Sequence, residues 1–180
     1  MKKSFFAALA VAAILCGCRS SKVRISGKFL GLNSETVYLE QMSTVSGQTV
    51  VDSVALAPDG SYRFVVTGVP ATPSMYNIVY NNERIPLLIS GGENVTVGSL
   101  GSVLANYTVS GSAESELLRR FNKDYIAGIQ RLNSIMTDYA QAGGDDKRAL
   151  ARSYNEQYRT VKRNQISFIV ENKKSIASIY

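Results

Sequence analysis

The hydrophobic periodicity of this chain changes at Ser110-Gly111-Ser112, and that change constrains its fold more than any other feature. From residue 22 to residue 112, apolar and polar residues alternate in short runs separated by turn residues, which is typical of β-strands. After residue 112, apolar residues recur about every three and a half positions, which is typical of amphipathic helices. The sequence therefore predicts an α+β protein, with an antiparallel β-sandwich or barrel over residues 22–112 and an antiparallel helical hairpin over residues 113–180.

Short alternating runs define the strands expected in the β-domain. The residues Val50, Asp52, Val54 and Leu56, for example, share one parity and are expected to face a common core. The runs lie at residues 23–29, 37–39, 50–56, 62–66, 75–80, 84–90, 95–98 and 106–109.

Proline and glycine positions refine this picture. The stretch VVDSVALAPDGSYRFVV predicts a β-hairpin, because Pro58 presets φ at the turn and Gly60 can supply a positive φ. Asn81-Asn82 and Gly91-Gly92 are expected to connect later strands. Pro86 lacks a backbone donor, so its strand is expected to begin there or to lie at a sheet edge.

Two helices are expected after residue 112. The first covers residues 114–142, with Ser112 or Ala113 near its N-cap, and the second covers about residues 146–172. Gly143-Gly144-Asp145 separates them. The final SIASIY resembles the first turn of another helix, and docking of this segment onto the sheet is the alternative.

The N-terminus resembles a bacterial lipoprotein signal peptide over residues 1–17. Lys2 and Lys3 precede an uncharged run that is too short to span a membrane. Leu15-Cys16-Gly17-Cys18 then resembles a lipobox, in which Cys18 is the acylated residue and residues 18–21 form a lipidated tether. The alternatives are a disulfide, a Cys-x-Cys metal pair, or inert thiols in a cleaved signal.

A lipid anchor at Cys18 predicts a protein of the cell envelope. Its partner would be membrane lipid, which the acyl chains on Cys18 enter. No acidic run follows Cys18, which resembles lipoproteins that face the periplasm. The chain contains no histidine, so a Ser-His-Asp triad is excluded and the commonest metal ligand is absent. We therefore expect no metal, no cofactor and no enzymatic activity in this polypeptide.

Of the net charge of +6, Lys2 and Lys3 contribute +2, and the remaining +4 lies in the C-terminal third of the chain. Twelve basic and eight acidic residues lie between Ala113 and Tyr180, whereas six of each lie between Arg19 and Ser112. Because the basic residues are interspersed with acids, the pattern indicates a solvated helix face and not a nucleic-acid-binding surface.

Three weaker motifs admit two interpretations each. Asp52-Ser53-Val54 resembles an O-glycosylation acceptor with Ser53 as the modified residue, although ordinary strand polarity explains it better. The tyrosines at positions 76, 80 and 107 could stack on a glycan, but core packing is the favoured interpretation. Asp145 and Asp146 lack further oxygen ligands at calcium-loop spacing, so they indicate a helix start.

The order of these features resembles a known family. The relevant stretches are ISGKFLGLNSETVYLEQ, VVDSVALAPDGSYRFVVTG, IPLLISGGENVTV and VSGSAESELLRRFN. Together with the lipobox, they resemble the N-terminal domain of unknown function of Bacteroidota lipoproteins in the AhpC/TSA, thiol-disulfide interchange class. In that family a β-rich domain and a helical linker precede a thioredoxin-like domain with a Cys-x-x-Cys motif.

The resemblance implies a non-catalytic accessory module that acts as a spacer or a binding domain. This chain has no Cys-x-x-Cys motif, so no catalytic cysteine of the family corresponds to any of its positions. Two alternatives remain. The chain is a fragment of a redox lipoprotein whose partner is a C-terminal thioredoxin-like domain, or it is a stand-alone envelope lipoprotein that binds a glycan, a peptide, an envelope protein or a membrane partner.

Overall fold

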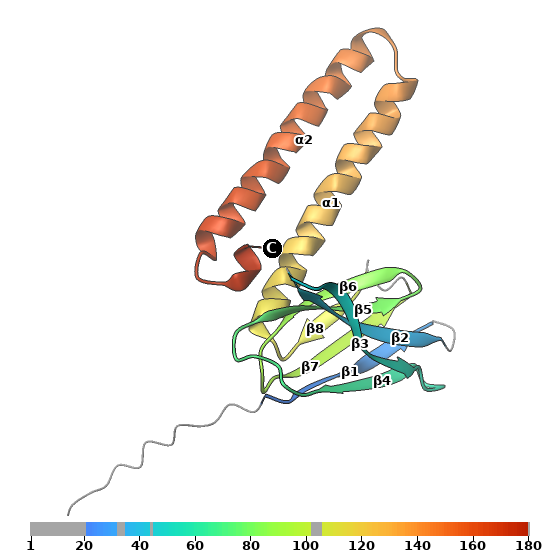
Figure 1. The fold of residues 1–180 in the computed structure, drawn as a ribbon. Helices are drawn as coiled ribbons and strands as arrows, with labels where there is room; N and C mark the ends of the chain where they lie inside the picture. Colours follow the sequence, from blue (N-terminus) through green and yellow to red (C-terminus); the bar gives the residue numbers. More distant parts are fainter. Residues whose placement is uncertain (1–20, 32–34, 44, 102–105, 180) are drawn as a thin grey trace, which may run out of the picture.

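The computed structural model describes residues 21–31, 35–43, 45–101 and 106–179. Within these ranges the fold is α+β, as the periodicity predicts: a two-sheet β-domain comes first and two long helices follow (Figure 1). The strands are β1 (Val23–Leu30), β2 (Thr36–Ser43), β3 (Gly47–Ala55), β4 (Ser61–Val66), β5 (Ser74–Tyr80), β6 (Glu83–Ile89), β7 (Asn94–Leu100) and β8 (Thr108–Ser110). The helices are α1 (Ala113–Gln141), α2 (Gly144–Glu171) and the short 3₁₀ turn η1 (Ile176–Ser178).

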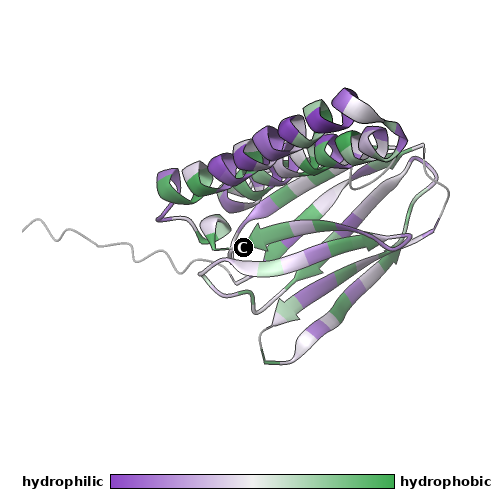
Figure 2. Cartoon of the chain, turned by 90° about the horizontal axis from the view of Figure 1, so that it is seen from above, coloured by the Kyte–Doolittle hydropathy of each residue, from purple (hydrophilic) through white to green (hydrophobic). Residues whose placement is uncertain are grey.

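The strands form two four-stranded sheets that enclose one core. The strand orders are β4-β1-β7-β8 in the first sheet and β3-β2-β5-β6 in the second. Hydrophobic and hydrophilic residues alternate along strands such as β1, β4 and β7, as expected for a sheet with one buried face, whereas β5 and β6 are buried along most of their length (Figure 2). One pair departs from the predicted antiparallel arrangement, because β1 and β7 run parallel in the middle of the first sheet.

The predicted hairpin around Pro58 and Gly60 is wrong in its strand pairing. The turn itself is present, with Gly60 at φ 77° and a hydrogen bond from Gly60 N to Ala57 O at 2.8 Å. The strands on either side of this turn, however, belong to different sheets: β3 pairs with β2, and β4 pairs with β1. The turn therefore carries the chain from one layer of the sandwich to the other.

The prediction that one parity of β3 faces the core is also wrong in part. The register between β2 and β3 shifts between Leu39 and Glu40, which leaves Val51 as an extra residue in β3. Such a bulge reverses the side-chain alternation beyond it. Val54 consequently packs against the core, whereas Val50 is 54% exposed on the outer face.

The core between the sheets is aromatic at its centre. Phe29 and Phe64 are fully buried, and Tyr62 lies between them, with ring centroids 4.7 Å from Phe29 and 5.8 Å from Phe64. The Tyr62 hydroxyl donates to Val97 O at 2.8 Å, and burial raises the pKa of this tyrosine above its usual range. Gly27 lies beside the same carbonyl, where a Cβ would be only 1.7 Å from Val97 O. Tyr62 of β4 thus reaches over Gly27 of β1 to Val97 of β7 within one sheet, and this close approach requires glycine at position 27.

The first helix begins where its predicted cap lies. Ser112 is the N-cap of α1 and its hydroxyl accepts a hydrogen bond from Ser115 N. The edge strand β6 carries Pro86, as the missing donor predicts, and α1 packs along it. The helices α1 and α2 form the expected hairpin, in which Leu132 and Val161 are buried.

The C-terminal segment docks onto the sheet, which was the alternative interpretation of SIASIY. Residues Ile176–Ser178 form a 3₁₀ turn, and Ala177 is buried in a cluster with Leu88 of β6 and Leu118 of α1. Glu114 fixes this turn, because its Oε2 accepts hydrogen bonds from Ser175 Oγ at 2.5 Å and from Ala177 N at 2.9 Å. The hairpin therefore returns the chain to the β-domain.

Candidate functional site

The two modification candidates differ in where the structure places them. Cys18 lies outside the described residues. Ser53 lies on the edge strand β3, opposite Tyr38, and both side chains are exposed on the outer face of the second sheet. The neighbouring Asp52 accepts a hydrogen bond at Oδ1 from Ser53 N at 2.8 Å, and the Ser53 residue is exposed.

The three tyrosines considered for glycan stacking are part of the core. Tyr76, Tyr80 and Tyr107 are each no more than 5% exposed, so their rings offer no open stacking surface. The favoured interpretation of core packing is confirmed. Tyr107 also supports the helix junction, because Arg119 of α1 donates from Nε to its backbone oxygen at 2.6 Å.

Metal-binding groups are not gathered at any point of the described chain. Among those residues, no three side chains of the His, Cys, Asp or Glu type lie close enough to share an ion. Asp145 and Asp146 lie in the first turn of α2, as their helix-start interpretation predicts, and Asp145 pairs with Arg148. The acidic side chains there complement the positive end of the helix dipole.

A groove of about 850 Å³ lies between α1 and α2. Its apolar walls include Phe121 and Phe168, whose ring centroids are 4.5 Å apart, and Arg120 and Arg131 lie at its rim. The helices approach closely at Gly128, where a Cβ would be 2.7 Å from Val161 Cγ2. The groove therefore runs along the hairpin past this tight contact, from Leu117 near the β-domain to Ser134 on α1.

Apolar side chains are exposed at the foot of the hairpin. Four of them lie on α2 and just after η1, and each is at least 50% exposed: Ile166, Ile169, Val170 and Ile179. Tyr125 and Met136 of α1 and Tyr158 of α2 are also more than a third exposed, so the two helices cover each other only in part. Such a surface is suited to contact with a further protein element.

The two sheets differ in charge, a feature that the sequence analysis missed. The strands of the β4-β1-β7-β8 sheet contain Arg24, Lys28 and Arg63 and no acidic residue. The strands of the other sheet contain three acidic residues, Glu40, Asp52 and Glu83, and a single basic one, Arg84. The alternation of Arg24 and Lys28 with the buried residues of β1 already places them outward, but only the sheet order brings Arg63 beside them.

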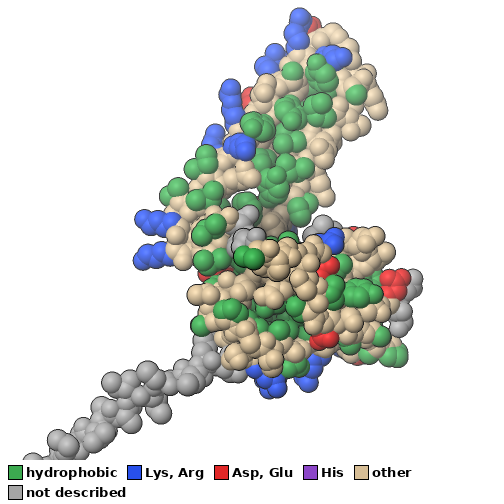
Figure 3. All heavy atoms as spheres, viewed as in Figure 1, with side chains coloured by type: hydrophobic (Ala, Val, Ile, Leu, Met, Phe, Trp, Pro, Cys, Tyr) green, Lys and Arg blue, Asp and Glu red, His purple; other side chains and the backbone are tan. Residues whose placement is uncertain are grey.

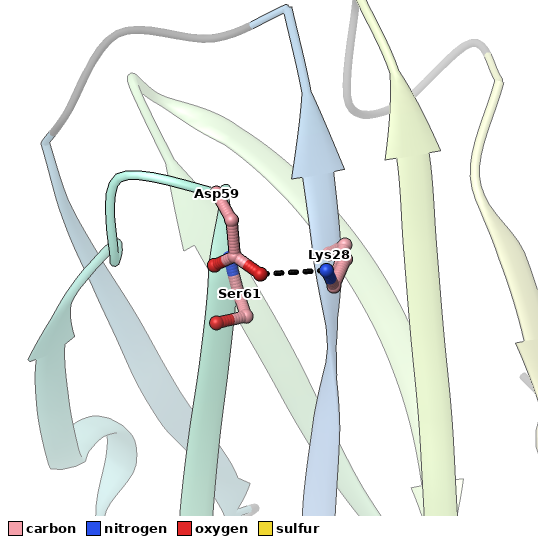
Figure 4. A network of polar contacts seen from close by, with 3 residues as sticks. All are labelled: Lys28, Asp59 and Ser61. Atoms are coloured by element: carbon pink, nitrogen blue, oxygen red, sulfur yellow. Dashed lines mark hydrogen bonds and ion pairs between the residues drawn. The ribbon is translucent and has the colours of Figure 1, made fainter.

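Lys28 is held in place by an ion pair across the β1–β4 edge. Its Nζ lies 2.6 Å from Asp59 Oδ2, and Asp59 Oδ1 accepts from Ser61 N at 3.0 Å (Figure 4). The hydrogen bond from Lys28, together with those from Ser61, holds the pKa of Asp59 well below its usual range. Arg24 donates to Asn94 Oδ1 at 3.2 Å, and neither Arg24 nor Arg63 forms an ion pair within the described part of the chain.

These features define the class of the protein as a two-sheet β-sandwich domain with an attached helical hairpin. A family model described as "Domain of unknown function (DUF4369)" matches residues 23–118, more than half of the chain, and the chain therefore belongs to this family. The match ends at Leu118, which is the residue of α1 that packs against Leu88 of the sheet. The sequence prediction of a domain of unknown function is thereby confirmed.

Comparisons with curated proteins and with solved structures say less about this chain than the family match. No curated protein matches the chain. Among solved structures, transthyretin from Sparus aurata is 12% identical, with a TM-score of 0.35 over 49% of this chain and 93% of that chain. Sea bream transthyretin in complex with thyroxine is 13% identical, with a TM-score of 0.36 over 51% of this chain and 96% of that chain. Among the described helices, none has both the length and the apolar character needed to cross a membrane.

Proposed function

We propose that this protein is a membrane-anchored lipoprotein module of the bacterial cell envelope that faces the periplasm. Its anchor is the acylated Cys18, and its folded part is a non-catalytic accessory domain of a thiol-disulfide interchange lipoprotein. The observation that carries the proposal is the pattern Leu15-Cys16-Gly17-Cys18, which follows a basic start and a short apolar run. Several acyl chains, each stabilised by about 0.8 kcal/mol per buried methylene, make such an anchor durable.

The non-catalytic role is supported by the chemistry of the side chains. Thiol-disulfide exchange requires an accessible thiolate, and usually a second cysteine to resolve the mixed disulfide. The two cysteines of this chain are Cys16 and Cys18, and the proposal assigns the first to the cleaved signal and the second to the lipid thioether. Any redox chemistry would then belong to another domain or protein.

The accessory role is supported by the arrangement of the hairpin. The helices α1 and α2 span 29 and 28 residues, and η1 brings the chain back to the foot of α1. A thioredoxin-like domain joined after residue 180 would lie beside the exposed apolar residues Ile166, Ile169, Val170 and Ile179. Burial of these residues against a neighbour would remove apolar surface from water.

Metabolic labelling with an alkyne analogue of palmitate tests the anchor. We expect the parent protein to incorporate the label and Cys18→Ser to lose it. Cys16→Ser is the matched control, which is expected to retain the label because position 16 would lie in the cleaved signal. Equal labelling of the parent and Cys18→Ser would show that the proposal is wrong.

Insulin reduction by dithiothreitol tests the non-catalytic role. The mature chain from residue 18, with Cys18 replaced by serine, contains no cysteine. We expect its rate of insulin precipitation to equal the background without protein. A rate above that background would contradict the proposed accessory role.

A second candidate, a stand-alone envelope lipoprotein that binds a glycan or a peptide, is favoured by the groove between α1 and α2. A ligand that binds only the native state must raise the melting temperature. Soluble peptidoglycan fragments can be used as the probe, with Tyr125→Ala as a variant of the groove wall. A rise in Tm that Tyr125→Ala abolishes would favour this candidate, and an unchanged Tm would count against it.

A further inference from the structure

We propose that the outer face of the β4-β1-β7-β8 sheet docks onto an anionic phospholipid surface. This inference rests on the proposed anchor, because the anchor is what keeps the domain next to a membrane. The docking face is defined by the basic residues Arg24 and Lys28 of β1 and Arg63 of β4, and by the neutral polar residues that lie beside them on β7 and β8.

Charge complementarity is the first argument. The four strands of this sheet contain no acidic residue, and their three basic residues are all exposed. Arg63 lies opposite Ser26, whose strand neighbours on the same face are Arg24 and Lys28. Asp59 offsets the charge of Lys28. The net positive charge of this face therefore comes from Arg24 and Arg63, because these strands contain no acidic residue to neutralise them. Each basic residue near an anionic leaflet contributes favourably to binding.

The polar residues beside Lys28 and Arg63 suit phosphate groups. A shallow depression of about 960 Å³ runs over this face, and its lining includes Ser26, Ser61, Thr96 and Thr108 beside Lys28 and Arg63. Hydroxyl and guanidinium groups donate hydrogen bonds, and phosphate oxygens accept them. A lipid headgroup is thus offered both charge and hydrogen bonds.

The length of the anchor is the second argument. The covalent chain from Cys18 to Val23, the first residue of β1, can span at most about 18 Å when fully extended. Arg24 follows directly, and Arg19 and Lys22 are basic residues of the connecting sequence. The anchor therefore keeps the basic face close to the lipid headgroups. Salt screens charges over a Debye length of about 8 Å, so basic side chains that come this close to the headgroups are still attracted to them.

The arrangement of the elements is the third argument. The hairpin of α1 and α2 rises from one side of the sandwich, whereas β1 and β4 lie on the other side (Figure 1). In the space-filling view, Lys and Arg side chains gather at that lower end of the sandwich (Figure 3). Docking through this face would direct the hairpin and its exposed apolar foot away from the membrane.

Co-sedimentation with vesicles tests the inference. The protein is the mature chain from residue 18 with Cys18→Ser, which contains every element of the fold but no acyl chain. We expect it to bind vesicles of phosphatidylcholine with one third phosphatidylglycerol, and to bind pure phosphatidylcholine at least tenfold more weakly. Raising the salt from 0.05 M to 0.5 M should release it, because exposed charges are screened.

Charge reversals on two faces supply the matched comparison. Arg24→Glu/Arg63→Glu is expected to lower binding to the anionic vesicles at least tenfold. Arg152→Glu/Arg159→Glu changes the net charge equally, but on exposed positions of α2, and should leave binding unchanged. Circular dichroism confirms that each variant is folded. Equal loss in both variants, or equal binding to both vesicle types, would overturn the inference.

An acidic polysaccharide tests the other polyanion that such a face could recognise. If heparin binds the parent chain and the anionic vesicles do not, the inference is wrong. The lipidation experiment remains separate: a chain that binds vesicles but is never labelled at Cys18 would contradict the anchor alone. A chain that is labelled but shows no preference for anionic vesicles would contradict the docking face alone.

Discussion

The Ser115 hydroxyl satisfies both backbone groups of Leu88: it accepts from Leu88 N at 2.9 Å and donates to Leu88 O at 2.8 Å. Both residues are fully buried. A side chain of α1 thus takes the place of a neighbouring strand at the outer edge of β6. This contact covers an edge that would otherwise present unpaired backbone groups.

Replacement of this hydroxyl is expected to weaken the junction. Ser115→Ala leaves the buried Leu88 N without a partner, which costs about 1–3 kcal/mol of unfolding free energy. The measurement is chemical denaturation followed by circular dichroism. Ser134→Ala, at an exposed position of the same helix, is the control and should change the unfolding free energy by less than about 0.5 kcal/mol. Equal values for the two variants would contradict the role given to Ser115.

Removal of the Glu114 carboxylate is expected to release the C-terminal turn. Glu114→Ala deprives Ser175 Oγ and Ala177 N of their shared acceptor, and hydrogen bonds to charged groups contribute about 1.5–3 kcal/mol. The exchange protection of the Ala177 amide should therefore fall roughly tenfold or more. Glu116→Ala removes an acceptor of Gly111 N instead, and it should leave Ala177 protected.

The contact between Gly128 and Val161 is expected to show strong coupling. Gly128→Ala alone should lower the unfolding free energy, because overpacking against Val161 costs about 1–3 kcal/mol and exceeds the gain of about 1 kcal/mol in helix propensity. In a Val161→Ala background the same change should be stabilising. A double-mutant cycle measures the difference, and additive effects would contradict close packing at this point.

The pair formed by Lys28 and Asp59 predicts a pH dependence below neutrality. The pKa of Asp59 is depressed in the folded state, so its contribution to stability is present above the ordinary value of 3.8 and is lost as the pH falls below it. The difference in unfolding free energy between wild type and Asp59→Asn should therefore shrink below about pH 4. In Lys28→Met, NMR titration should find the pKa of Asp59 shifted back toward 3.8, and an unchanged pKa would contradict the pairing.

Much of the local structure follows from the sequence. Ser112 was one of two expected cap positions, the positive φ of Gly60 was expected for a turn, and Pro86 was expected at a sheet edge. Each depends on the conformational preference of one residue and its near neighbours. The alternation over residues 23–29 likewise predicts a strand, and β1 covers Val23–Leu30. These features are decided by interactions that span only a few residues, so a single sequence is sufficient to predict them.

Strand pairing could not be obtained in this way. The turn at Pro58 and Gly60 permits a hairpin, but β3 pairs with β2 in one sheet and β4 pairs with β1 in the other. The bulge at Val51 and the parallel pairing of β1 with β7 also depend on distant partners. Local propensity is the same for both arrangements, and only packing between the layers distinguishes them.

By itself, the sequence determined the α+β class and the absence of imidazole, and it confined the thiols to Cys16 and Cys18. It also showed equal numbers of basic and acidic residues between Arg19 and Ser112. Only the tertiary structure separated these charges, because sheet order brings Arg63 next to Arg24 on one face and places Glu40 and Asp52 in the other sheet. The field at a surface depends on which side chains share a face, and that is decided by long-range strand pairing.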